Sequence, residues 1–562
     1  MTSPVEVGLS SSSGVRGLAG TTLPPLPVNE PVRPYAPGSA QRASLEARIG
    51  ELAKEPTELT MTIDGRQRAG SGAPIEVVQP HRHAAVLGTT HEAGPGDVQA
   101  AVHAALAAAP AWRAAAYDDR AAVLLRAAEL LAGPWRDTLN AATMLGQSKT
   151  VHQAEIDSAC ELIDFLRFNV AFGAQVLAEQ PASSPGAWNR MDHRPLEGFV
   201  LAITPFNFTA IAGNLPLAPA LMGNTVVWKP SPTQQFAAHF TMRLLEAAGL
   251  PPGVINMVTG NGGAVSDSVV PHPDLAGIHF TGSTGTFQAL WQKVGQGLTT
   301  YKTYPRLVGE TGGKDFVLAH PSADPLALEV ALVRGAFEYQ GQKCSAASRA
   351  YIPRSLWEGG LRDGLADRTR SLIYGDVTDL SLFGGAVIDR RAYDRLSRAQ
   401  KRAAVEPSLE VLAGGTADDS VGFFVQPTVV VGSDPTDEVF VQEYFGPLLA
   451  VHVYDDSPPG AWADVLRLVD RTALFALTGA VFARDAYAVA EATEALRFTA
   501  GNFYVNDKPT GAVVGQQPFG GARASGTNDK AGSVLNLLRW TSPRTLKETL
   551  DPATNHRYPH MG

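Results

Sequence analysis

The amino-acid sequence predicts an α/β fold with more than one domain and a mostly parallel β-sheet. Three observations favour this fold class. The chain has 562 residues, whereas a typical domain has roughly 100–200. Hydrophobic residues make up 44% and charged residues 18%, which is the balance of a globular protein rather than a disordered one. Short apolar runs alternate with helical patterns along much of the chain, as they do in βαβ units.

The elements follow one another in a regular order. Residues 1–44, rich in Ser, Gly and Pro at their start, are expected to form a flexible arm. Amphipathic or Ala-rich patterns predict helices over 97–116, 118–131, 151–177, 233–248 and 325–339. Apolar runs predict strands at 199–203, 225–228, 254–258, 277–280, 316–319, 350–352, 428–431 and 449–453. Gly249 can end one helix, and Asp324 can cap the start of another, with Pro325 at its first position.

Charge, cysteine content and hydropathy exclude several classes of function. The net charge is −9, and no basic stripe is present, so no nucleic-acid partner is expected. Two cysteines cannot form a disulfide framework and are typical of a reducing compartment. The uncharged stretch Phe199–Trp228 holds three prolines and three asparagines, which favours buried soluble structure over a membrane span. No apolar signal core stands at the N-terminus. We therefore expect a cytoplasmic protein, with the mitochondrial matrix as the alternative because the N-terminus is poor in acidic residues.

The two cysteines have different sequence settings. Cys344 lies in the glycine-containing loop Gly341–Ser345 next to Lys343, where a neighbouring cation can lower the thiol pKa and favour the nucleophilic thiolate. A buried structural thiol is the alternative for this residue. Cys160 lies within the predicted helix 151–177, where nothing local would activate it, so we interpret it as a core residue.

Polar residues directly after predicted strands are the other candidates, because ligands bind at the carboxyl ends of parallel strands. Glu310, flanked by glycines, could be a general base for water, and a solvated loop acid is its alternative. Asn207 could donate to an oxyanion or simply bond its own loop. The segment 280–285 closes a strand and opens a helix whose N–H groups could bind a pyrophosphate, although it lacks the G-x-G-x-x-G pattern. Lys229 could reach a ribose or a phosphate, or extend along the surface.

Each of these signals is weak alone, but their order along the chain is specific. They run through Asn207, Lys229-Pro230-Ser231, Phe280-Thr281-Gly282-Ser283, Glu310 with Gly312-Gly313-Lys314, Cys344, and Glu443-Tyr444-Phe445-Gly446-Pro447. Glu310 precedes Cys344 by 34 residues. This series resembles the NAD(P)-dependent aldehyde dehydrogenase superfamily over about residues 50 to 550.

Further segments narrow the resemblance to one subgroup. Residues 340–346, 500–508 and 514–526, with the helical run 154–165, resemble 1-pyrroline-5-carboxylate dehydrogenases, which oxidise L-glutamate γ-semialdehyde to L-glutamate in the second step of proline catabolism. Two positions depart from the wider superfamily. Phe287 stands where many members have Gly, and Pro232 stands where NAD-selective members often have Glu. The subgroup shares both departures. The resemblance implies NAD as the cofactor, and the departure at Pro232 leaves NADP as the alternative.

The resemblance implies a role for each candidate residue. Cys344 would attack the aldehyde, Asn207 and the Cys344 N–H would hold the oxyanion, and Glu310 would activate the water that hydrolyses the thioester. NAD would be bound by Thr204, Phe206, Lys229, Ser231, Thr281, Gly282, Ser283, Glu310, Glu443 and Phe445. The substrate would be bound by Ser345, Gly511 and Ala512 at its carboxylate, by Phe208 and Phe519 along its aliphatic chain, and by Glu161. No metal is implied.

The resemblance also implies how the chain is organised. A Rossmann-like NAD-binding domain would comprise 45–185 and 197–312, a catalytic α/β domain 313–536, and a small β oligomerisation arm 186–196 and 537–555. Such arms pair between subunits in this superfamily, so a homodimer or larger homo-oligomer is expected. A proline dehydrogenase is a candidate partner.

Four other interpretations compete with this one. The nearest is another aldehyde dehydrogenase, for example one that acts on succinic semialdehyde. A CoA-acylating member would lack the glutamate at position 310, and a bifunctional proline-oxidising enzyme would need a flavin-binding barrel for which 562 residues leave no room. A non-catalytic scaffold is the fourth, and the joint presence of Cys344, Glu310 and Asn207 argues against it.

Overall fold

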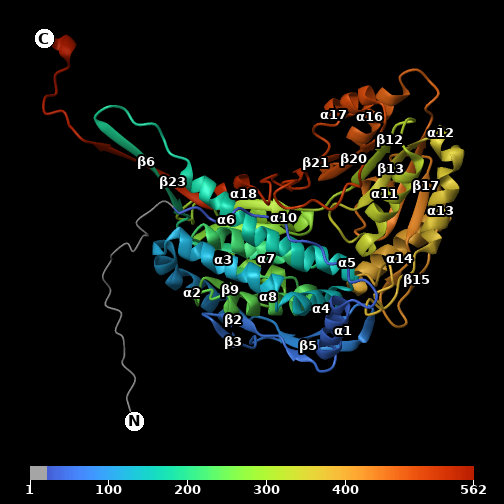
Figure 1. Cartoon of the computed structure of the whole chain (residues 1–562), viewed down its shortest axis with the longest axis horizontal. Helices are drawn as coiled ribbons and strands as arrows, with labels where there is room; N and C mark the ends of the chain where they lie inside the picture. Colours follow the sequence, from blue (N-terminus) through green and yellow to red (C-terminus); the bar gives the residue numbers. More distant parts are fainter. Residues whose placement is uncertain (1–21) are drawn as a thin grey trace.

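Two seven-stranded β-sheets form the two main bodies of the molecule (Figure 1). The structure is a computed structural model that describes residues 22–562. The first sheet has the order β11-β10-β7-β8-β9-β2-β3, with β2 (Met61–Ile63), β3 (Arg66–Arg68), β7 (Phe199–Ile203), β8 (Thr225–Lys229), β9 (Ile255–Met257), β10 (Leu275–Thr281) and β11 (Arg306–Glu310). The second has the order β14-β17-β18-β13-β12-β20-β21, with β12 (Asp315–Ala319), β13 (Ala347–Pro353), β14 (Leu409–Ala413), β17 (Thr428–Gly432), β18 (Leu448–Tyr454), β20 (Thr478–Phe482) and β21 (Asn502–Val505).

The α/β prediction is confirmed, and each predicted strand coincides with or overlaps an observed one. Most neighbours in both sheets run parallel; β2 against its two partners and β14 against β17 are antiparallel. β7 and β8 are buried at every position, because parallel strands covered by helices on both faces need apolar side chains on both. The uncharged stretch Phe199–Trp228 therefore forms β7, helix α7 and most of β8. Within residues 22–562, no helix is long and apolar enough to cross a membrane.

Helices cover both faces of each sheet. On the first sheet, one hydrophobic core is built with α2 (Pro95–Ala114), α9 (Gly262–Val269) and α10 (Thr284–Gln296), and the other with α3 (Tyr117–Ala132), α6 (Leu162–Ala178), α7 (Thr209–Leu221) and α8 (Gln235–Ala247). On the second sheet, α11 (Pro325–Phe337) and α13 (Arg362–Ser371) cover one face, and α14 (Arg390–Val405), α16 (Ala461–Thr472) and α17 (Ala486–Ala495) the other. Asp324 caps α11 as predicted, accepting from the N–H groups of Leu326 and Ala327.

Smaller elements complete the body. A three-stranded sheet of β1 (Thr57–Glu58), β4 (Pro74–Gln79) and β5 (Arg82–His91) shares a core with α1 (Ala40–Leu52) and α4 (Arg136–Gln147). Short helices are α5 (Val151–Ala154), α12 (Arg354–Leu356), α15 (Glu438–Val441) and α18 (Val534–Leu538). The remaining short strands are β15 (Ala417–Asp418), β16 (Phe424–Val425), β19 (Phe475–Ala476) and β22 (Ala522–Arg523).

A two-stranded antiparallel ribbon projects from the body (Figure 1). It consists of β6 (Ala187–Pro195) and β23 (Thr541–Thr549), paired from Thr541 opposite Pro195 to Thr549 opposite Ala187. The ribbon falls within the two segments predicted for the β arm, 186–196 and 537–555. The second segment begins differently from the expectation, since residues 537 and 538 still belong to helix α18. The limits of the domains themselves stay a prediction.

One predicted helix is interrupted. The segment 151–177 consists of α5, a π-helical stretch Glu155–Glu161, and α6. Amphipathic periodicity does not distinguish a π turn from an α turn over so few residues. Such turns are rare and often occur at functional sites, and this one carries the buried carboxylates of Glu155 and Asp157.

The N-terminal segment differs from the flexible arm predicted for residues 1–44. Residues 1–21 lie outside the described part of the chain. Further on, Tyr35 is only 4% exposed, and the Arg33 N–H and the Tyr35 hydroxyl donate to the two carboxylate oxygens of Glu155. Helix α1 begins at Ala40, inside the predicted arm, because the Ser39 side chain caps it. Composition indicated flexibility here, whereas contacts with residues more than a hundred positions away hold the segment.

Candidate active site

The carboxyl ends of four parallel strands bring the predicted residues to one edge of the first sheet. In the register, Ile203 pairs with Lys229, Phe280 with Ile203, and Thr281 with Glu310. The loop that holds Asn207 therefore begins beside Lys229 and beside the segment after Thr281. This is the edge at which open α/β sheets bind ligands.

Cys344 lies in a strained loop between α11 and β13. Tyr339 and Gln340 have φ values of 51° and 54°, in the left-handed region that non-glycine residues rarely adopt. The Gln340 amide holds this conformation by donating to the carbonyls of Ser148 (3.0 Å) and Ala386 (2.7 Å). The Cys344 backbone also packs closely against Gly313. A Cβ at Gly313 would lie 2.3 Å from the Cys344 carbonyl oxygen, so only glycine fits there.

The expectation that Lys343 lowers the pKa of the Cys344 thiol is wrong for this structure. Burial, followed by the nearby carboxyl groups of Asp315, Glu310 and Glu443, raises that pKa. The Lys343 ammonium group instead pairs with Glu338 at 3.2 Å. Residues adjacent in sequence can point their side chains to different partners, so proximity along the chain does not guarantee electrostatic contact.

Glu310 ends β11 and faces the same region as Cys344. Its carboxylate accepts a hydrogen bond from the Gly521 N–H at 2.8 Å. Burial raises the pKa of this carboxyl well above its usual value, so the group binds a proton more readily than an exposed glutamate does. Phe287 packs behind this strand end. Its ring lies 2.3 Å from the place where a Cβ of Gly309 would stand, and it stacks on Phe280 with ring centroids 5.4 Å apart. The phenylalanine at position 287 therefore fills a packing role.

Asn207 is buried and directed toward the Cys344 loop. Its Nδ2 donates to the carbonyl of Gln342 at 3.0 Å, two residues before the cysteine. An amide Nδ2 carries two N–H groups, so one remains for an oxyanion near the thiol. This bond fixes the Asn207 side chain to the loop that carries the nucleophile.

Cys344 and Glu310 open into a cavity of about 350 Å³. Of the other predicted residues, its wall includes Thr281, Phe208, Phe519, Glu161, Ser345, Gly511 and Ala512. Asn207 and most of the predicted cofactor residues lie outside this wall. Cys160 also lines the cavity, although burial raises its pKa to about 12, which agrees with its interpretation as an unreactive thiol.

One part of the cavity wall is rich in hydrogen-bond donors. Within residues 22–562, neither the Gly511 N–H nor the Ala512 N–H has a hydrogen-bond partner, whereas the Val513 N–H donates to Gln517. Gly511 has a φ of 99°, and a Cβ there would lie 3.4 Å from the Lys508 Nζ. The hydroxyl of Ser345 lies 2.8 Å from that of Thr510. We name residues 510–514 the anchor loop.

Several residues at the cavity were missed by the sequence reasoning, among them two lysines and a histidine. Lys343, Lys508 and His152 all line it. Lys508 ends the segment 500–508, which carried part of the resemblance. Its position three residues before Gly511 could therefore have indicated a cation at the predicted carboxylate site. Nothing local in the sequence indicated His152 or the cavity-facing position of Lys343.

Glu161 places a carboxyl group on another part of the wall. It lines the cavity from the end of the π-helical stretch, and burial followed by the neighbouring Asp157 raises its pKa well above the usual value. A cationic group in the cavity would oppose this shift and favour the carboxylate. The cavity therefore offers both cationic and anionic partners.

Several of the predicted cofactor residues lie at the strand ends outside this cavity. The Lys229 ammonium group is buried without a hydrogen-bond partner among residues 22–562, and burial lowers its pKa to about 8. Ser283 caps α10 by accepting from the Thr286 N–H, which leaves the N–H groups of Thr284 and Gly285 without intrahelical partners. A Cβ at Gly285 would meet open space. An unpaired ammonium group and an open helix start fit a ribose and a pyrophosphate.

The remaining cofactor candidates are held by neighbouring groups. The Glu443 carboxylate accepts from the Gly313 N–H at 2.8 Å, and burial raises its pKa to about 7. The rings of Phe206 and Phe445 meet edge to face at 5.7 Å. The Thr204 hydroxyl accepts from the Trp228 indole at 3.0 Å, and the Ser231 hydroxyl lies 3.1 Å from that of Thr233.

A buried ion pair supports the loops of Asn207 and Cys344 together. Lys149 and Asp157 are each fully buried and 2.6 Å apart. The Lys149 ammonium group lies 4.2 Å from the ring centre of Phe208 and 4.4 Å from that of Tyr339. Asp157 accepts from the N–H groups of Thr209 and Ala210, which begin α7. The pair therefore joins the loop after β7 to the loop before Cys344.

Lys149→Met is expected to lower the free energy of unfolding by about 3–5 kcal/mol, because it leaves Asp157 buried without its cation. Denaturant unfolding followed by circular dichroism measures the change. The matched control is the double variant Lys149→Met/Asp157→Asn, which removes both charges and should recover part of the loss. Equal stability of wild type and Lys149→Met would contradict the role given to the pair.

Comparisons with known proteins give consistent matches. The model of the aldehyde dehydrogenase family matches residues 67–546. The crystal structure of the delta-pyrroline-5-carboxylate dehydrogenase from Mycobacterium tuberculosis bound with NAD is similar with a TM-score of 0.93 and 61% identity, over 97% of this chain and 100% of that one. The probable delta-1-pyrroline-5-carboxylate dehydrogenase of Schizosaccharomyces pombe is 48% identical over 94% of this chain and 97% of its own length. The mitochondrial delta-1-pyrroline-5-carboxylate dehydrogenase of Bos taurus is 48% identical over 95% and 94%.

Proposed function

The chain belongs to the aldehyde dehydrogenase family, and on this premise we propose that it oxidises L-glutamate γ-semialdehyde, formed from 1-pyrroline-5-carboxylate, to L-glutamate with NAD. This is the second step of proline catabolism. The proposal rests on the hydrogen-bond donors, the lysine and the carboxyl group that line the cavity of Cys344. The unpaired N–H groups of Gly511 and Ala512, with Lys508 beside them, suit a carboxylate, and Glu161 suits an ammonium group. The relatives named above support the same substrate.

The chemistry begins at Cys344. Its thiolate adds to the aldehyde carbon, and the oxygen that becomes negative is held by the Asn207 Nδ2 and the Cys344 N–H. Because burial raises the thiol pKa, the proton must leave to a base before or during the attack. We assign this proton to solvent water in the cavity, so the Glu310 carboxylate stays available for the later hydrolysis.

When NAD is bound it would supply the hydride acceptor, so that the tetrahedral adduct on Cys344 could become a thioester. Lys229 and Glu443 would hold its riboses and the start of α10 its pyrophosphate, with Thr204, Phe206, Ser231, Thr281, Gly282 and Phe445 as the other contacts. The open space at Gly285 and the unpaired Lys229 ammonium group support this placement.

Hydrolysis of the thioester completes the reaction. Glu310 takes a proton from water, and the resulting hydroxide attacks the thioester carbon and releases the carboxylate product and the Cys344 thiolate. Phe208 and Phe519, which line the cavity, would enclose the aliphatic chain of the substrate.

The proposed function is tested by NADH formation with three aldehydes that differ in their charged groups. Glutamate semialdehyde, which forms when pyrroline-5-carboxylate is hydrolysed in solution, carries both a carboxylate and an ammonium group, succinic semialdehyde only a carboxylate, and propanal neither. We expect kcat/KM to fall in that order, by roughly 10- to 100-fold for each charged group lost, since a charge-assisted hydrogen bond contributes about 1.5–3 kcal/mol. Equal values for pyrroline-5-carboxylate and propanal would contradict the proposal.

Ser345→Ala is expected to weaken the reaction with pyrroline-5-carboxylate selectively, by roughly 10-fold in kcat/KM, because one donor to the substrate carboxylate is lost. Propanal, without a carboxylate, is the matched control and should change much less. Gly511→Ala tests the loop itself, because a side chain at a φ of 99° is strained. If both aldehydes lost the same factor in Ser345→Ala, the hydroxyl would be structural.

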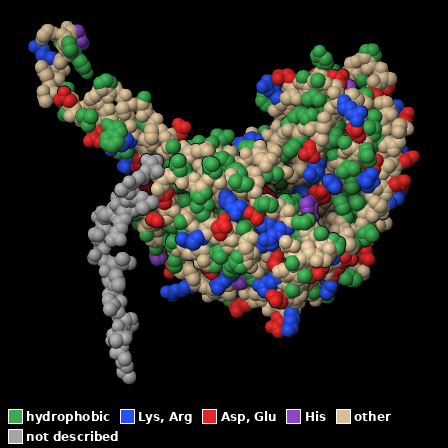
Figure 2. Space-filling view, viewed as in Figure 1, with side chains coloured by type: hydrophobic (Ala, Val, Ile, Leu, Met, Phe, Trp, Pro, Cys, Tyr) green, Lys and Arg blue, Asp and Glu red, His purple; other side chains and the backbone are tan. Residues whose placement is uncertain are grey.

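We also propose that the β6–β23 ribbon joins subunits into a homodimer or a larger homo-oligomer. Trp188 on this ribbon is 51% exposed, and hydrophobic side chains are visible along it in Figure 2. A proline dehydrogenase, whose product would be the substrate here, is the proposed partner. We place the protein in the cytoplasm, with the mitochondrial matrix as the alternative.

A further inference from the structure

The N-terminal segment contributes directly to the wall of the substrate cavity. Asn29, Glu30 and Val32 line it, although they precede residue 67, where the family match begins. These residues lie near the start of the described chain. They therefore add a wall that the two α/β bodies do not supply.

Asn29 ties this segment to two other parts of the cavity wall. Its Nδ2 donates to the Asp164 carboxylate on α6 at 2.8 Å and to the Val514 carbonyl at 2.9 Å. Its Oδ1 accepts from the Gln516 Nε2 at 3.0 Å. One amide thus uses both of its N–H groups and its oxygen to connect α6 with the end of the anchor loop.

Apart from the Asn29 bond, the anchor loop is held by the Thr510–Ser345 hydroxyl contact and by hydrogen bonds between Val513 and residues 516 and 517. It contains Gly511, and Gly515 follows it, with φ values of 99° and 81°. Glycine has the widest conformational freedom, so a loop with two of them loses more entropy when it is ordered. Gly515 packs directly on α6, since a Cβ there would lie 2.2 Å from the Phe168 ring. The Val514 carbonyl that accepts from Asn29 lies between this contact and the unpaired N–H groups of Gly511 and Ala512.

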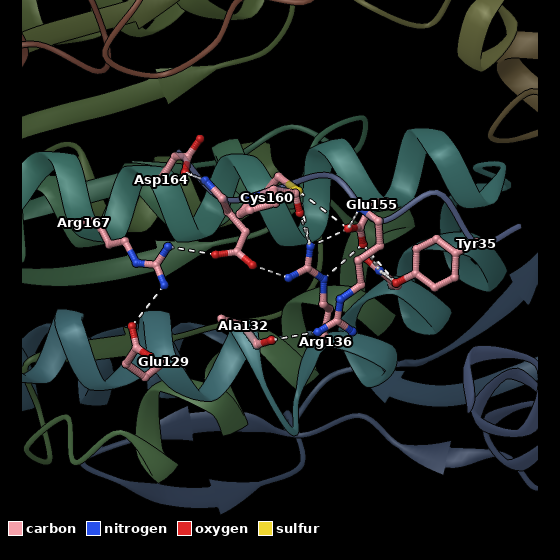
Figure 3. A network of polar contacts seen from close by, with 12 residues as sticks. Tyr35, Glu129, Ala132, Arg136, Glu155, Cys160, Asp164 and Arg167 are labelled. Carbon is pink, nitrogen blue, oxygen red and sulfur yellow. Dashed lines mark hydrogen bonds and ion pairs between the residues drawn. The ribbon is translucent and has the colours of Figure 1, made fainter. Parts of the chain in front are cut away.

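The segment itself is held by contacts other than those of Asn29. The Glu30 carboxylate pairs with Arg136 at 2.5 Å and with Arg167 at 2.8 Å, and the Glu30 N–H donates to Asp164 at 2.7 Å. Figure 3 shows Arg136 and Tyr35 meeting the Glu155 carboxylate, and Arg167 reaching Glu129. A change at Asn29 should therefore loosen the anchor loop without releasing the segment.

We propose that Asn29 is a positioning residue for substrate specificity, which holds the anchor loop where its N–H groups receive the substrate carboxylate. The inference rests on the proposed function, because it takes the carboxylate of glutamate semialdehyde as the group that the loop binds. Asn29 acts through the loop and does not touch the reacting carbon. Its loss should raise KM for a carboxylate substrate and leave the chemical step intact.

Two variants separate hydrogen bonding from packing. Asn29→Ala removes all three bonds, and Asn29→Asp keeps the size and the acceptor but removes both donors. For each, we expect KM for pyrroline-5-carboxylate to rise roughly 5- to 30-fold, which corresponds to the loss of one or two net hydrogen bonds. kcat and the kcat/KM for propanal should stay near the wild-type values. Arg33→Ala is the control, because it removes one bond of the same segment, to the Ala132 carbonyl at 3.2 Å, away from the anchor loop. It should leave both aldehydes unchanged.

Hydrogen exchange of the NAD-free protein gives a readout that does not depend on the substrate. Amides 511–517 should exchange faster in Asn29→Ala than in wild type and in Arg33→Ala. Unchanged exchange in these amides, or an equal loss for pyrroline-5-carboxylate and propanal, would overturn the inference. If wild type did not oxidise pyrroline-5-carboxylate, the proposed function would fail, and the exchange rates alone would then decide whether Asn29 holds the loop.

Discussion

Cys344→Ala is expected to abolish aldehyde oxidation, with kcat lowered by about 10⁴-fold or more, while NAD binding stays measurable. Removal of a catalytic nucleophile has effects of this order, because the covalent route is lost and only binding and oxyanion stabilisation remain. Steady-state NADH formation measures the first effect and NAD titration followed by protein fluorescence the second. The proposed NAD site lies at the ends of β8, β10 and β11 and the start of α10, away from the Cys344 side chain, so it should persist in the variant.

Cys160→Ala is the matched control for this prediction. Cys160 is 5% exposed and lies 3.5 Å from the Arg136 guanidinium and 3.7 Å from Glu155. The Cys160→Ala substitution should lower the free energy of unfolding by about 1 kcal/mol, the usual cost of a single substitution. It should leave turnover close to wild type. Near-normal turnover in Cys344→Ala would overturn the assignment of the nucleophile.

The raised pKa of Cys344 predicts a pH dependence of its reactivity. The thiolate is the reactive form, and a pKa above the ordinary value means that its fraction at neutral pH is small and grows as the pH rises. Alkylation of the NAD-free protein by iodoacetamide should therefore accelerate steadily from pH 7 upward, with Cys344→Ala as the blank. A rate that reached its plateau below pH 7 would show that the thiol pKa is lowered, as the adjacent Lys343 suggested from sequence alone.

Glu310→Gln is expected to form the thioester and then stall. One equivalent of NADH should appear in a burst, after which the steady-state rate should be lower than that of wild type by about 10²–10⁴-fold, the usual contribution of a general base. The glutamine oxygen can still accept from the Gly521 N–H, which now bonds the Glu310 carboxylate at 2.8 Å, so the loop should keep its shape. Rapid mixing with pyrroline-5-carboxylate measures the burst.

The absence of a burst in Glu310→Gln would assign an earlier role to this residue. It would then activate the thiol or position the nicotinamide, and another group would activate the water. Glu443→Gln is a useful comparison, because its carboxylate also has a raised pKa, of about 7, but bonds the Gly313 N–H on the cofactor side. It should weaken NAD binding and retain hydrolysis of the thioester.

The sequence by itself determined the fold class, the strands and the order of the reactive residues. Apolar runs such as 199–203 and 225–228 are buried strands because their side chains need cover on both faces, which is a local property of the chain. The start of α11 was also predictable, since the capping side chain of Asp324 and the proline after it act within three residues. Parallel pairing then carries Glu310 and the residues after Ile203 and Thr281 to one edge, which the alternation of strands and helices already implied.

Only the tertiary structure decided the environment of these residues. The pKa of Cys344 depends on burial and on carboxyl groups brought from β11, β12 and the segment before β18, and not on its sequence neighbour Lys343. The N-terminal segment was expected to be flexible because its composition is polar, yet Asn29 and Tyr35 find partners more than a hundred residues away. Desolvation and ion pairing depend on distance in space, whereas periodicity and capping depend on distance along the chain; the sequence therefore specified the elements, and the packing of those elements set the charges of the site.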